Sequence, residues 1–68
     1  MENGELVEHA AREAIRQHGH NAVAVLLDRA DTADEQGDRL SAEAWRDIAD
    51  EAERILRETD QAGVAPAL

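Results

Sequence analysis

Two histidines separated by one residue are the side chains in this sequence best suited to bind a metal. His18 and His20 flank Gly19, and imidazole is a common ligand of transition metals. In a continuous helix, residues two apart project about 200° from each other, and no carboxylate stands at the short fixed offset used by zinc-binding helices. We therefore interpret both side chains, and His9, as surface residues. A metal-responsive bundle using His18 and His20 is kept as an alternative.

A series of acidic residues follows the histidines. The series lacks the alternating ligand order and the terminal Glu of a calcium-binding loop. The favoured interpretation is a solvated acidic face. The alternative is mimicry, because carboxylates spaced along a helix can imitate a phosphate backbone and occupy the nucleic-acid site of a basic protein. The residues are Asp28, Asp31, Asp34, Glu35 and Asp38.

The residue types that are missing argue against catalysis. The 68 residues include no Cys and no Lys, and their only hydroxyl side chains are those of Thr32, Ser41 and Thr59. A thiolate nucleophile, a disulfide framework and a lysine base are thereby excluded. The sequence also has no Gly-rich phosphate-binding loop. We predict a protein that is not an enzyme and uses no cofactor.

The charge balance indicates which partners to expect. The sequence has sixteen acidic residues and seven arginines, which gives a formal net charge of −9 and a pI near 4.5. Such a surface repels nucleic acid and anionic membranes, so we predict a protein partner, and a basic one would be favoured electrostatically. The acidic N-terminus lacks the basic region of a signal peptide, and the longest apolar run covers only residues 22–27. We therefore expect a cytoplasmic location.

Apolar periodicity predicts an all-α fold with helices over residues 4–18, 21–36 and 41–59. Residues 1–59 would form one domain, and residues 60–68 a flexible tail. Gly19 predicts a break that Asn21 could cap, although a single helix through Gly19 is the alternative. Gly37 should end the middle helix, and Asp38 or Ser41 should cap the last one. The two readings at Gly19 give a three-helix antiparallel bundle or a long helical hairpin.

The apolar residues predict self-association. Much of the 43% hydrophobic fraction is alanine, and Trp45 is the one aromatic residue, so a single chain this short can bury little area. Trp45, Ile48 and Ile55 form a heptad-like seam that Leu56 widens, while Val25 lies off the main stripe of its helix. We predict that these residues bind protein, and that the bundle dimerises into a larger helical assembly. The predicted protein-binding residues are Val25, Trp45, Ile48, Ile55 and Leu56.

Parts of residues 19–56 resemble a group of short alphaproteobacterial helical proteins of uncharacterised function. The resemblance rests on Arg29-Ala30-Asp31, Gly37-Asp38, Ala44-Trp45-Arg46-Asp47-Ile48 and Ala52. It implies a small free-standing helical domain and carries no catalytic residues. A likeness to one tetratricopeptide unit is weaker, because its large aromatic positions are unmatched and no second copy is present to stack on. The leading functional hypothesis is a homodimeric interaction module, and the alternative is an acidic inhibitor of a basic nucleic-acid-binding protein, for instance a phage-derived anti-defence protein.

Overall fold

The computed structural model describes residues 2–64, with side chains placed for residues 4–59. Helix α1 spans Glu2–His18, a short 3₁₀ turn η1 spans Gly19–Asn21, α2 spans Ala22–Glu35 and α3 spans Arg39–Val64. All regular structure in this part of the chain is helical. The predicted all-α class is confirmed.

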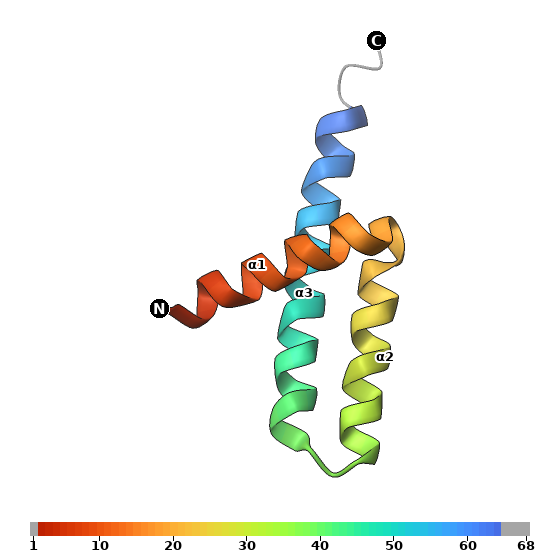
Figure 1. The fold of residues 1–68 in the computed structure, drawn as a ribbon. Coiled ribbons are helices and arrows are strands. Elements are labelled where there is room, and N and C mark those ends of the chain that lie inside the picture. Colours follow the sequence, from red (N-terminus) through yellow and green to blue (C-terminus); the bar gives the residue numbers. More distant parts are fainter. Residues whose placement is uncertain (1, 65–68) are drawn as a thin grey trace.

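Helices α2 and α3 pack antiparallel as a hairpin, and α1 crosses that hairpin at a steep angle (Figure 1). The N-terminal turns of α1 project past α3, and the C-terminal turns of α3 project beyond α1 (Figure 1). The chain measures 50 × 26 × 16 Å along its principal axes. The antiparallel packing of α2 against α3 is confirmed. Helix α1 crosses this pair and does not complete the three-helix antiparallel bundle that a break at Gly19 was expected to give, and dimerisation stays a prediction.

The corner between α1 and α2 lies at Gly19. Its φ of 61° is in the left-handed region, which glycine adopts without steric cost. The break predicted there is confirmed, and the alternative of one continuous helix is wrong. Asn21 makes no side-chain capping hydrogen bond, so the expected Asn21 cap is not formed. The backbone N–H of Ala22 instead donates to the carbonyl of Gly19 and closes the turn.

The turn between α2 and α3 satisfies its backbone groups locally. Gly37, at φ 82°, donates its N–H to the carbonyl of Asp34 at 2.9 Å, and Asp38 donates its N–H to the carbonyl of Ala33 at 2.8 Å. These two bonds form a Schellman motif. The Asp38 carboxylate then accepts a hydrogen bond from the N–H of Ser41 at 3.1 Å. Asp38, rather than Ser41, is therefore the N-cap of α3.

Helix α3 is longer than its periodicity predicts. It begins at Arg39, two residues before the expected start, because the cap lies at Asp38. It continues to Val64, five residues beyond the expected end at Thr59, while residues 65–68 of the predicted tail lie outside the described residues. Residues 60–62 contain no helix breaker, and one glycine such as Gly63 costs a helix only about 1 kcal/mol relative to alanine.

The buried core consists almost entirely of alanine. Among the residues with placed side chains, Leu26 is the only large one that is buried, at 3% exposure. Small side chains let helix backbones approach closely, but each removes little apolar area from water. The hairpin is thus tightly packed without a large hydrophobic centre. The buried alanines are Ala11, Ala22, Ala30, Ala33, Ala42, Ala49 and Ala52.

Candidate protein-interaction surface

The five residues predicted to bind protein are all half-buried. Trp45, Ile48 and Ile55 pack against the small core cluster that contains Leu26 and Ala49. Val25 and Leu56 are half-buried outside that cluster. The large apolar side chains of this chain therefore lie at the edge of the core, with part of each side chain in contact with solvent.

Helix α1 divides the predicted seam into two regions. Ile48 lines a hollow on one side of α1, together with Leu6 and Ala10. Ile55 lines a different, more polar hollow, together with Ile15 and Arg16. Residues that share one stripe of α3 therefore face two separate surfaces.

Val25 and Trp45 meet in an apolar hollow of about 290 Å³ where all three helices come together. Leu26 lines the same hollow from α2, and Ala14 lines it from α1. The guanidinium of Arg29 lies 5.4 Å from the centroid of the Trp45 ring, within the range of a cation–π contact. Arg29 thus lies over the Trp45 indole, and Trp45 also lines the hollow.

A second apolar hollow, here called the notch, lies where the projecting turns of α1 leave α3. It has a volume of about 440 Å³, and Asp47 is its one charged lining residue. Leu6 is 65% exposed there. The notch is lined by Leu6, Val7 and Ala10 of α1 and by Ala44, Asp47 and Ile48 of α3.

Among the residues that line the notch, Ile48 is the one that was predicted to bind protein. Leu6, Val7 and Ala10 belong to the apolar stripe from which the helix over residues 4–18 was predicted. The stripe indicated that these residues pack against another surface, but it could not show that they stay partly exposed. They are partly exposed because α1 crosses the hairpin steeply, so that its first turns extend beyond the hairpin (Figure 1).

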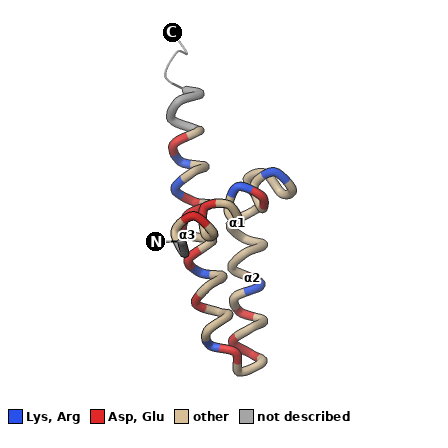
Figure 2. Tube along the Cα trace, turned by 60° about the vertical axis from the view of Figure 1, so that its left-hand side comes forward, with Lys and Arg blue, Asp and Glu red and all other residues tan. Residues whose placement is uncertain are grey.

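The predicted acidic residues are all exposed but have different roles. Asp34 forms an ion pair with Arg46 across the hairpin, and hydrogen bonds from the hydroxyl and N–H of Ser41 lower the pKa of the capping Asp38. Within residues 4–59, no ion pair is formed by the other three, Asp28, Asp31 and Glu35. Acidic segments along α2 and α3 can be followed in Figure 2.

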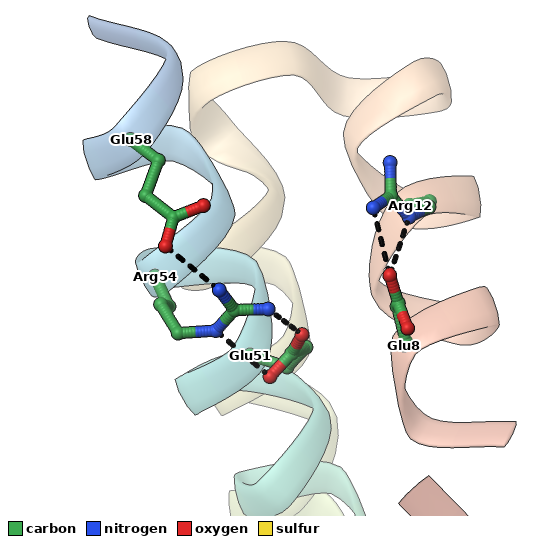
Figure 3. Close-up of polar contacts among 5 residues, drawn as sticks. All are labelled: Glu8, Arg12, Glu51, Arg54 and Glu58. Carbon is green, nitrogen blue, oxygen red and sulfur yellow. Dashed lines mark hydrogen bonds and ion pairs between the residues drawn. The ribbon is translucent and has the colours of Figure 1, made fainter. Parts of the chain in front are cut away.

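A group of ion pairs lies on α3 and on the facing side of α1 (Figure 3). Arg54 bonds Glu51 on one side and Glu58, at 2.8 Å, on the other, and Arg12 bonds Glu8 at 2.7 Å. The hydrogen bond from Arg54, with the nearby charges of Arg54 and Arg12, lowers the pKa of Glu51. Each of these ion pairs joins residues of one helix and is largely solvated, so it contributes little stability.

The histidines do not assemble a metal site in the described part of the chain. His18 is half-buried beside the hollow that contains Trp45, and His20 is exposed within η1. No group of three or more His, Asp or Glu side chains converges there as metal ligands would. Among the described helices, none combines the length and the apolar character needed to cross a bilayer.

No protein-family model, curated protein or solved structure matches the chain.

Proposed function

We propose that this chain is a non-enzymatic protein-interaction module that associates with itself through its half-buried apolar residues. The proposal is supported by the sizes of the buried and the partly exposed apolar side chains. Within residues 4–59, the buried positions are occupied by seven alanines and Leu26, while Trp45, Ile48 and Ile55 remain partly exposed around them. Apolar surface left in contact with water favours association with another protein surface.

Size supports the same proposal. A chain of about 70 residues seldom forms a core that supplies more than 3–5 kcal/mol, and small domains commonly rely on disulfides, metals or oligomerisation. This chain contains no Cys. Oligomerisation then becomes the most direct source of additional stability. The same apolar contact would leave the acidic outer surface available to a further protein.

Sedimentation equilibrium of the full chain, at several protein concentrations and at 0.05 and 0.5 M salt, tests this function. We expect a dimer or a higher assembly, because apolar contacts persist at high salt. Since each copy carries nine net negative charges, salt should strengthen the association by screening repulsion. A folded monomer at every concentration and both salt levels would contradict the proposal.

A second candidate function is supported by three carboxylates of α2 that make no ion pair within residues 4–59. Asp28, Asp31 and Glu35 recur at three- and four-residue spacing on the outer side of α2. They could bind the nucleic-acid site of a basic protein, as an acidic inhibitor would. Such binding would weaken steeply with salt, whereas self-association would strengthen. Competition between this chain and DNA for a basic DNA-binding domain would test the inhibitor function.

A further inference from the structure

The corner between α1 and α2 is built differently from the turn between α2 and α3. In the turn, the hydrogen bonds of a Schellman motif are followed by the Asp38 cap. At the corner, neither His18 nor Asn21 makes a side-chain capping hydrogen bond. Asn21, at φ −81° and ψ −4°, already lies in the right-handed helical region. Gly19, at φ 61°, is the residue of the corner with a positive φ, and it therefore sets the change of direction.

The contact that holds α1 on the hairpin is made largely by alanine. Helix α1 supplies Ala11, which is fully buried, while Ala14 and Ile15 pack against the same core cluster. Each alanine removes little apolar area from water, so lifting α1 costs less than separating a contact between large side chains. Arg12 forms its ion pair with Glu8 of α1 itself, and this pair is kept when α1 lifts. Helix α1 is thus able to leave its own hairpin.

A hairpin without α1 exposes a surface that fits the α1 of another copy. This surface contains Leu26, Ala49 and Ala52, which form the core cluster with Ala11, and α1 lies across it in the structure (Figure 1). Because two copies are identical, α1 of one copy can make on the hairpin of the other every contact that it makes on its own. Exchange of an identical element in this way is a low-cost route to a dimer.

We propose that two copies of this chain exchange their α1 helices, and that α1 and α2 of each copy then join into one continuous helix over residues 2–35. The exchange rests on the self-association proposed above and specifies how it occurs. The continuous helix, which the single chain does not form, requires Gly19 to move from φ 61° to a helical value near −60°. One glycine inside a helix lowers the helix equilibrium only about fivefold relative to alanine.

The dimensions of the continuous helix place the two copies beside each other. Residues 11 and 26, which share a core cluster in the single chain, would lie ~22 Å apart along it. This separation is about two helix diameters, so the two hairpins would be neighbours. A straight helix also directs α1 away from its own α3. Helix α1 would therefore pack on the hairpin of the other copy.

Substitution of Gly19 tests the exchange by sedimentation equilibrium. Gly19→Ala should lower the dissociation constant of the dimer roughly 100-fold, because alanine is strained at a positive φ in the single chain and favoured in the continuous helix of both copies. A Cβ added at Gly19 meets no atom within 4 Å, so the substitution acts through backbone conformation alone. Gly4→Ala, which lies inside α1 in both states, should leave the constant unchanged. Gly19→Asn should have a much smaller effect, since asparagine tolerates the left-handed region.

Distances within one chain identify the exchange directly. Glu5 and Asp31 are exposed, and spin labels on Glu5→Cys and Asp31→Cys would lie ~39 Å apart along a continuous helix. They lie closer in an unexchanged chain, because α1 turns at Gly19. Labelled chains are diluted into excess unlabelled wild type, so that each distance belongs to one chain. The control pair, Asp31→Cys with Asp50→Cys, lies on the hairpin and should give the same distance in monomer and dimer.

The expected result is the long distance in the dimer and the short distance in the monomer. A dimer that keeps the short distance would overturn the exchange and leave self-association intact, and so would a dissociation constant that a folded Gly19→Ala protein leaves unchanged. A wild type that stays monomeric at every concentration would overturn both proposals. The distances are measured with the natural Gly19, so they decide the exchange even where Gly19→Ala fails to fold.

Discussion

The contact between α2 and α3 and the surface beside α1 are built from residues of different size. The hairpin contact buries alanines such as Ala30 and Ala42, each at 0% exposure. The surface beside α1 carries Trp45, Ile48 and Leu6, and all three stay partly exposed. Small residues therefore complete a contact within one chain, while the larger residues lie where a second surface could still be added.

Removing Leu26, the one large side chain buried among residues 4–59, should cause the largest loss of stability. Leu26→Ala should lower the free energy of unfolding by about 3 kcal/mol, since it leaves a cavity among alanines that cannot fill it. Its neighbour Leu27, at 44% exposure, is the matched control, and Leu27→Ala should cost less than half as much. Urea unfolding followed by Trp45 fluorescence measures both. Equal losses would show that the hairpin contact does not depend on Leu26.

Enlarging an alanine of the hairpin contact should also destabilise the protein, by overpacking the contact instead of leaving a cavity. Ala30→Leu should cost about 1–3 kcal/mol, because the added atoms force the backbones of α2 and α3 apart. Ala24→Leu, on the exposed side of the same helix, should change the stability little. Urea unfolding separates the two variants. A stabilised Ala30→Leu protein would mean that the contact has unfilled space.

Two glycine substitutions, one in the turn before α3 and one in α1, should change the stability in opposite directions. Gly37→Ala should destabilise the protein by about 1 kcal/mol, because φ of 82° is costly for residues with a Cβ. Gly4→Ala, within α1 and with no atom within 4 Å of the added Cβ, should stabilise by roughly 0.5–1 kcal/mol through helix propensity. Thermal unfolding followed by circular dichroism would show opposite shifts; a stabilised Gly37→Ala protein would contradict the turn geometry.

Acidification should have the smallest of these effects. Hydrogen bonds from Ser41 lower the pKa of Asp38 in the folded state, so the stabilisation is present above the unfolded pKa, near 4. It is lost as the pH falls from there through the folded pKa. Asp38→Asn retains a good N-cap residue and removes the titration. Its melting temperature should fall less than that of the wild type between pH 6 and pH 2.5; identical pH profiles would contradict this assignment.

Features set by neighbouring residues could be predicted from the sequence. The break at Gly19 and the cap at Asp38 depend on backbone conformation and a short-range hydrogen bond, which the residue types specify. The notch could not be predicted in the same way. The apolar stripe of residues 4–18 indicates which side of α1 packs, but not the angle at which α1 crosses α3. That angle separates Ile48 from Ile55 and exposes Leu6.

In the proposed assembly, the large apolar residues left partly exposed in one chain are covered by a second chain. The dependence of the urea unfolding midpoint on protein concentration tests this proposal most directly, because association stabilises the folded state by mass action. A folded dimer should gain about 1.4 kcal/mol of apparent stability for each tenfold rise in concentration. We expect a midpoint that rises steadily from 1 to 100 µM protein. A midpoint that is the same at both concentrations would contradict the proposal.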